Sequence, residues 1–290
     1  LDRNTMFKIF LKTILLLIFY VVVQQMLAAF IGTFCYIVDT DLLHQFMENP
    51  ELAKDMDYIM NMSQELVRDP KFIIMQMGIG MASASVVYIL LMLLFRLVHK
   101  NTHRTTWQSI VWALLLVLPL AIVGNIVVEL FGVEDVLANI MSQAMRTPWG
   151  AVSIAVVGPI AEEVCFRTGI MGVFIKAAKQ TGNQQLIPLG LMTQAVLFAG
   201  LHVNPAQVVF AVLLGWLFGW VYYISGSIWP CIVMHVANNS IAVIMNNCCP
   251  DLNSTVSLFG GTAGAVIVAL ACLGVIMLLL TKYRYVPPTD

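Results

Sequence analysis

Residues 149–175 read WGAVSIAVVGPIAEEVCFRTGIMGVFI, an apolar run with three charged side chains in its interior. A transmembrane helix needs about 20 predominantly apolar residues, and this run is longer. A charge at mid-helix costs at least about 2.5 to 3.5 kcal/mol on insertion scales unless it is paired or hydrated. The run therefore predicts a membrane helix, and its charged residues, Glu162, Glu163 and Arg167, become candidates for a functional site.

The composition of the whole chain agrees with a membrane protein. Of its 290 residues 60% are hydrophobic and 11% are charged, and the mean hydropathy is +0.86. An ordinary soluble domain has roughly 25% charged residues, so a soluble fold is excluded. The net charge of -1 offers no concentrated basic face, and we expect no nucleic-acid partner. We expect one transmembrane domain over residues 1–290.

Eight apolar segments are long enough to be membrane helices, because backbone groups in lipid must be satisfied within each segment. They cover about residues 7–34, 72–98, 107–131, 149–175, 186–203, 206–224, 229–247 and 258–281. The predicted fold class is all-α, a polytopic helical bundle with about eight transmembrane helices.

The distribution of Lys and Arg predicts the orientation of the bundle. Ten of these residues flank one side of the predicted spans, and four flank the other: Lys54, Arg68, Lys71 and Arg146. Because positive charge is enriched on the cytoplasmic side, both termini are expected in the cytoplasm. We expect an integral, multi-pass protein of a bacterial cell membrane.

Residues 39–70 form the one sizeable loop and carry eight acidic residues among Leu, Met, Phe and Tyr. We expect an acidic, partly helical external loop whose apolar residues would let it lie on the bundle or on the membrane interface. No chemistry is assigned to it.

Two further spans carry polar residues that are unusual in a membrane. The segment 186–203 contains Phe198 and ends near His202, and the segment 229–247 contains His235 and Asn239. Residues four apart on a helix share a face, so Glu163 can pair with Arg167, and His235 lies beside Asn239. Glu162 is rotated by about 100° from its neighbour and can face a different cavity.

These side chains suit the hydrolysis of a carbonyl compound. A carboxylate in a low-dielectric cavity beside an imidazole can take a proton from an attacking water, and Glu162 with His202 is the predicted pair. The oxyanion that forms needs hydrogen-bond donors, which Asn239 and His235 can supply. We expect no nucleophilic side chain; Cys165 lies between the glutamates and Arg167, but that position does not by itself indicate activation.

The three motifs resemble those of the CPBP family of intramembrane endopeptidases, which includes the type II CAAX prenyl proteases and bacteriocin-processing or immunity (Abi-like) proteins. The family pattern EExxxR, FxxxH, HxxxN is matched in order by Glu162-Glu163-xxx-Arg167, Phe198-xxx-His202 and His235-xxx-Asn239. The resemblance covers residues 150–245, the predicted catalytic core. It implies that Glu162 and His202 activate water, that His235 and Asn239 stabilise the oxyanion, and that Glu163 and Arg167 support the site.

The expected function is thus a glutamate-dependent endopeptidase acting on a membrane-associated peptide or prenylated protein in the lipid bilayer, without a cofactor. A zinc-dependent version of the same protease ranks second, because two His and a Glu can bind zinc although no H-E-x-x-H motif is present. A non-enzymatic transporter or immunity protein is the other alternative, in which buried carboxylates relay protons. For Glu163 and Arg167, an ion pair that only fixes helix packing competes with a direct role.

Overall fold

The computed structural model describes residues 2–100, 105–202, 204–252 and 254–282, and every regular element in these ranges is helical. The elements before the first gap are α1 (Arg3–Asp39), α2 (Leu42–Glu48), η1 (Pro50–Lys54), α3 (Met56–Leu66), α4 (Pro70–Met75), η2 (Gln76–Gly80) and α5 (Met81–Leu94). Next come α6 (Trp107–Leu130), α7 (Ala138–Met145), α8 (Pro148–Val152), η3 (Ser153–Val157), α9 (Gly158–Glu163), η4 (Val164–Met171) and α10 (Gly172–Thr181). The last are α11 (Leu186–Gly200), α12 (Pro205–Ser225), α13 (Trp229–Cys248), α14 (Thr255–Leu258) and α15 (Thr262–Lys282). The all-α prediction is confirmed.

Six continuous helices in the described ranges are long and apolar enough to cross a membrane. They are Arg3–Asp39, Pro70–Leu94, Trp107–Leu130, Pro148–Thr181, Pro205–Ser225 and Thr262–Lys282. The other two predicted spans are helices but fall outside this set: α11 has 15 residues, and α13 carries one His and four Asn side chains. The chain is an integral, multi-pass membrane protein, while the count of eight spans and the cytoplasmic termini remain predictions.

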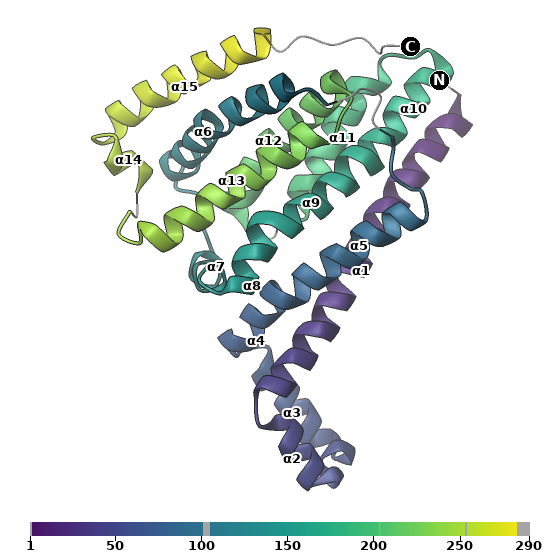
Figure 1. Cartoon of the computed structure of the whole chain (residues 1–290), viewed down its shortest axis with the longest axis vertical. Helices are drawn as coiled ribbons and strands as arrows, with labels where there is room; N and C mark the ends of the chain where they lie inside the picture. The colour runs from purple at the N-terminus through teal and green to yellow at the C-terminus, as the bar shows by residue number, and fades with distance from the viewer. Residues whose placement is uncertain (1, 101–104, 203, 253, 283–290) are drawn as a thin grey trace.

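The helices differ in how much of their surface the protein covers. In the most apolar window of α1 and of α15 only 17% of residues are buried, compared with 56% in α12. The helix α15 packs on α6, α11 packs on α12, and α13 packs on α6, η3 and α9 (Figure 1). The apolar outer faces of α1 and α15 therefore suit contact with lipid, and the polar motifs lie on inner helices.

A close helix contact joins α1 to the start of the second span. A Cβ atom on Gly80 would lie 2.5 Å from the carbonyl oxygen of Ala28, so only glycine allows the two backbones to approach this closely. Nearby, the buried Gln24 amide donates a hydrogen bond to Ser85 Oγ at 3.0 Å. This contact fixes the long α1 against α5.

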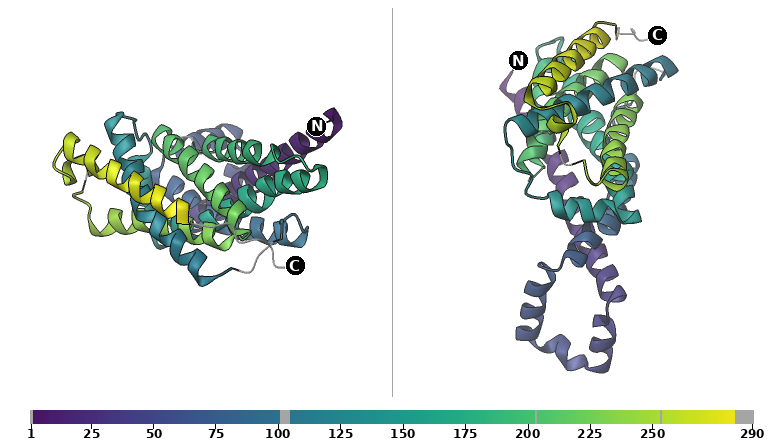
Figure 2. Two further views of the ribbon diagram at one scale, coloured as in Figure 1. Left: turned by 90° about the horizontal axis from the view of Figure 1, so that it is seen from above. Right: turned by 90° about the vertical axis from the view of Figure 1, so that its left-hand side faces the viewer.

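The segment of residues 40–69, here called the extension, projects away from the helical body instead of lying along it (Figures 1 and 2). It consists of α2, η1 and α3 and is partly helical, as predicted. At its base, the Tyr36 hydroxyl donates a hydrogen bond to Asp69, and Lys71 Nζ lies 2.8 Å from an oxygen of Asp39. These contacts join the two ends of the extension where it leaves the bundle.

Candidate active site

The helix that carries the two glutamates changes its winding on both sides of them. Residues Pro148–Thr181 form one continuous run, in which the π-helical stretches η3 and η4 flank the short α-helix α9. Pro159 has no N–H for the helical ladder, and a Cβ on Gly158 would lie 2.7 Å from the carbonyl oxygen of Ser153. Widened π-turns occur frequently at functional sites, because they redirect the side chains that follow. Glu162 and Glu163 end α9 and lie between two such stretches.

Glu163 and Arg167 form the buried ion pair that their spacing predicted. Both side chains have no exposed surface, and Arg167 Nε lies 2.7 Å from Glu163 Oε2 while Nη2 lies 3.0 Å from Oε1. Three aromatic rings surround the guanidinium, with centroids 5.2 to 6.0 Å from Cζ: those of Phe166, Phe198 and Phe218. A bidentate pair in a desolvated, aromatic surrounding holds both partners in one geometry.

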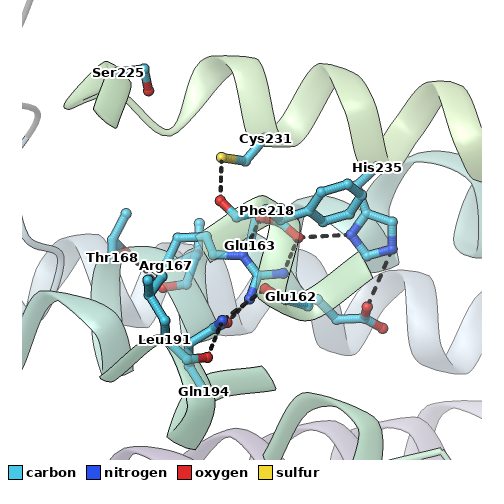
Figure 3. Close-up of polar contacts among 12 residues, drawn as sticks. Glu162, Glu163, Arg167, Thr168, Leu191, Gln194, Phe218, Ser225, Cys231 and His235 are labelled. Atoms are coloured by element: carbon cyan, nitrogen blue, oxygen red, sulfur yellow. Dashed lines mark hydrogen bonds and ion pairs between the residues drawn. The ribbon is translucent and has the colours of Figure 1, made fainter. Parts of the chain in front are cut away.

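His235 on α13 connects the two neighbouring glutamates (Figure 3). Its Nδ1 lies 2.9 Å from Glu163 Oε1, and its Nε2 lies 3.6 Å from Glu162 Oε2. The ring is almost fully buried, whereas the Glu162 side chain keeps 24% of its surface exposed. Glu162 is therefore the accessible carboxylate of the pair, and His235 is the imidazole nearest to it.

His202 lies at the end of α11 and is partly buried. Its ring packs against Phe198 with centroids 5.2 Å apart, and the same Phe198 ring lies 5.8 Å from that of His235. The Nδ1 of His202 donates to the Phe198 carbonyl oxygen at 3.0 Å, which leaves Nε2 available. Within the described part of the chain, His202 forms no ion pair with Glu162. The two histidines thus share an aromatic neighbour. The role of His202 in activating water and that of His235 as an oxyanion donor remain predictions.

Asn239 lies one turn beyond His235 on α13, as predicted. Its Nδ2 donates to the carbonyl oxygen of Ile154 at 2.9 Å, and its Oδ1 accepts from Asn238 at 3.1 Å. Since a carboxamide nitrogen carries two hydrogens, one N–H remains for an incoming oxyanion. The bond to Ile154 ties this donor to the π-helical stretch that precedes the glutamates.

The sequence did not identify Gln194, a fully buried residue of α11 that also belongs to this network. Its Oε1 accepts a hydrogen bond from Arg167 Nη1, and its Nε2 donates to the carbonyl oxygens of Leu191 at 2.9 Å and Gly215 at 2.7 Å. The signal available in the sequence was a single uncharged amide within an apolar segment. Such an amide often only forms a hydrogen bond between packed membrane helices, so by itself it is a weak indication of a functional residue.

Whether the site can hold zinc depends on how the possible ligand side chains are arranged and on the bonds that they already form. Among the described residues, no group of three His, Cys, Asp or Glu side chains is arranged to hold a metal ion. One oxygen of Glu163 is bonded to both His235 and Arg167, and the other to Arg167. The donor set as arranged therefore does not fit a zinc ion. Cys165 is fully buried, which does not favour its use as a nucleophile.

Comparison with known proteins supports a protease. Residues 144–241 match the family described as Type II CAAX prenyl endopeptidase Rce1-like, and this range holds all three motifs. A protein of Bacillus subtilis (strain 168), named "Putative membrane peptidase YdiL", is 26% identical over 169 residues, which are 54% of this chain and 66% of that protein. The matched part is thus just under two thirds of that relative. No solved structure matches significantly. The resemblance to the CPBP family is confirmed.

Proposed function

We propose that this chain, whose residues 144–241 match the type II CAAX prenyl endopeptidase family, hydrolyses a peptide bond within the membrane and uses Glu162 as the general base. The observation that carries the proposal is the different surroundings of two adjacent carboxylates. Glu163 is fully buried and accepts hydrogen bonds on both oxygens, whereas Glu162 is partly exposed and lies 3.6 Å from an imidazole nitrogen. A general base needs access to water, and Glu162 has it.

In the proposed reaction, a water molecule attacks the carbonyl carbon of the scissile bond and gives its proton to Glu162. The new C–O bond turns the carbonyl oxygen into an oxyanion, which the free N–H of Asn239 stabilises. The C–N bond then breaks, and the leaving amine takes up the proton. His202, with Nε2 available beside Phe198, is the proposed second partner for the water.

The proposed substrate is a membrane-associated peptide, with a prenylated C-terminus as the first form to test. The family description names a prenyl endopeptidase, and that name is the basis for this choice. The relative from Bacillus subtilis is named as a membrane peptidase without a substrate, so an unmodified peptide is the second form to test. A hydrolase embedded in lipid meets both kinds of substrate at the membrane surface.

The experiment compares wild-type protein with Glu162→Gln, purified in detergent, on matched peptides with and without a farnesyl group. Loss of a general base lowers kcat about 10²- to 10⁴-fold, and Glu162→Gln should fall in this range or below detection. The matched control is Glu129→Gln, since Glu129 lies at the end of α6 and bonds Ser254 and Val256. That control should keep wild-type activity. An active Glu162→Gln protein would refute the assigned base.

A further inference from the structure

The orientation of the Gln194 side chain is fixed by its surroundings. Its amide nitrogen contacts two carbonyl oxygens, those of Leu191 and Gly215, which can only accept hydrogen bonds. The amide oxygen must therefore point the other way, and it meets Nη1 of Arg167 (Figure 3). Gln194 thus contributes a fixed acceptor to a guanidinium that is fully buried.

The next link of the network is fixed in the same way. Arg167 donates through Nε and Nη2 to both oxygens of Glu163, so Glu163 is an acceptor on both sides and has no hydrogen to offer. The contact between Glu163 Oε1 and His235 Nδ1 at 2.9 Å consequently requires that Nδ1 carries the hydrogen. In neutral His235, Nε2 is then the unprotonated nitrogen, and it faces Glu162.

We infer that Gln194 is a positioning residue, which acts through Arg167 and Glu163 to fix His235 in the Nδ1–H tautomer with Nε2 directed at Glu162. His235 is then the proton-exchange partner of Glu162, and it can donate a hydrogen bond to the oxyanion only after Nε2 has taken up that proton. Glu162, after taking a proton from water, can pass it to Nε2, and the imidazolium can return it to the leaving amine, so that no net proton is gained or lost. The inference rests on the proposed function only for the role of Glu162 as the base.

The test measures the tautomer of His235 directly and needs no substrate. Protein labelled with ¹⁵N-histidine is purified in detergent, and two-bond ¹H–¹⁵N correlations report which ring nitrogen carries the hydrogen. Glu163→Gln and Gln194 variants are compared with wild type, and His235→Gln identifies the signal among the five histidines of the sequence. In neutral His235 of the wild type, we expect hydrogen on Nδ1 alone.

Two substitutions of Gln194 separate positioning from packing. Gln194→Met removes the acceptor and frees the carbonyls of Leu191 and Gly215, which can attract Arg167 away from Glu163. A buried carboxylate without its counter-ion is neutralised by a proton and can then donate to Nδ1, so we expect loss of the single tautomer. Gln194→Glu keeps an oxygen directed at Arg167 but gives up the donation to those carbonyls; we expect the Nδ1–H tautomer to remain. If Gln194 acted only by holding α12 through Gly215, both variants would behave alike, and that result would overturn the inference.

The matched control is Gln24→Met. Gln24 is also a buried glutamine that bonds a neighbouring helix, through Ser85, but it lies on α1 and has no contact with Arg167. It should lose stability as Gln194→Met does and keep the wild-type tautomer. If Gln194→Met does not fold, Glu163→Gln tests the network at the residue that contacts His235 directly. Its amide can donate to Nδ1 of His235, so the ring hydrogen should move to Nε2. An Nδ1–H tautomer retained in Glu163→Gln or in folded Gln194→Met contradicts the inference.

Activity provides the second readout. Positioning partners of functional histidines typically change activity about 10- to 100-fold, so kcat of Gln194→Met should fall within this range. KM should stay near the wild-type value, because Gln194 is buried and does not reach the substrate. Gln194→Glu should recover most of kcat. If no peptide is cleaved by any form of the protein, the proposed function fails while the tautomer measurement still decides this inference.

Discussion

Replacing Arg167 by Met should destabilise the protein strongly, because it leaves a buried carboxylate without its counter-ion. The substitution keeps a long side chain of similar reach but removes three hydrogen bonds, two to Glu163 and one to Gln194. With Glu163 completely shielded from solvent, water cannot replace them without opening the helix packing. Breaking a buried pair from one side costs about 3 to 5 kcal/mol, and this value applies here because both partners are fully buried.

The assay follows the free energy of unfolding of purified protein in mixed micelles by tryptophan fluorescence. Arg167→Met should lower it by about 3 to 5 kcal/mol. Adding Glu163→Gln removes the unpaired charge and leaves a side chain that can still hydrogen-bond His235, so the double variant should regain about 2 kcal/mol or more. The exposed Arg146 provides the control, and Arg146→Met should change stability by about 0.5 kcal/mol or less. An Arg167→Met protein within about 1 kcal/mol of wild type would refute a desolvated ion pair.

Three further predictions concern the helix contact, the extension and the metal question. Gly80→Val should separate α1 from the second span and cost about 1 to 3 kcal/mol of unfolding free energy, because its Cβ would lie 2.5 Å from the Ala28 carbonyl oxygen; an unchanged unfolding midpoint would contradict this packing. The Tyr36 hydroxyl and the Lys71 N–H keep the pKa of Asp69 below its usual 3.8. The contact between Tyr36 and Asp69 at the base of the extension should therefore be intact at neutral pH and be lost as the pH falls through this lowered pKa. Amide hydrogen exchange of residues 40–69, corrected for intrinsic rates, should therefore rise in acid, and Tyr36→Phe should weaken this pH dependence, because only the Lys71 N–H then remains on Asp69. Cleavage should survive chelators, and metal analysis of active protein should find no stoichiometric zinc; activity restored only by added zinc would favour the metal-dependent alternative.

The sequence predicted helix positions well where hydropathy changes sharply. The segment 107–131 corresponds to Trp107–Leu130, and 206–224 corresponds to Pro205–Ser225. The prediction ended the first span at residue 34, whereas α1 continues to Asp39 and contains 37 residues. A helix of this length extends about 55 Å, beyond the hydrocarbon layer, and hydropathy no longer marks its end there.

Only the contacts of the candidate site between residues close together in the sequence could be predicted. The pair of Glu163 and Arg167 follows from the helical repeat and is confirmed. The expected pairing of Glu162 with His202 depends on how two different helices are oriented. The structure places His235 within 3.6 Å of Glu162, a contact that the sequence did not predict, and the joint activation of water by Glu162 and His202 remains a prediction. Gln194 could not be identified because its partner is 27 positions away in sequence, and only the packing of α11 against η4 brings them together.

Two adjacent glutamates in one helix would repel each other if both faced the same cavity, and the helical rotation between them prevents this. Glu163 points inward, where Arg167 and His235 together occupy both of its oxygens. A carboxylate that accepts these three hydrogen bonds and has no exposed surface is poorly placed to take a proton from water. Glu162 leaves the helix about 100° away, keeps part of its surface open and has only a 3.6 Å contact with the other nitrogen of the imidazole. In the proposed mechanism the same residue type thus serves in two ways, and the direction of each side chain from the helix, more than its chemistry, assigns Glu163 to support and leaves Glu162 free to react.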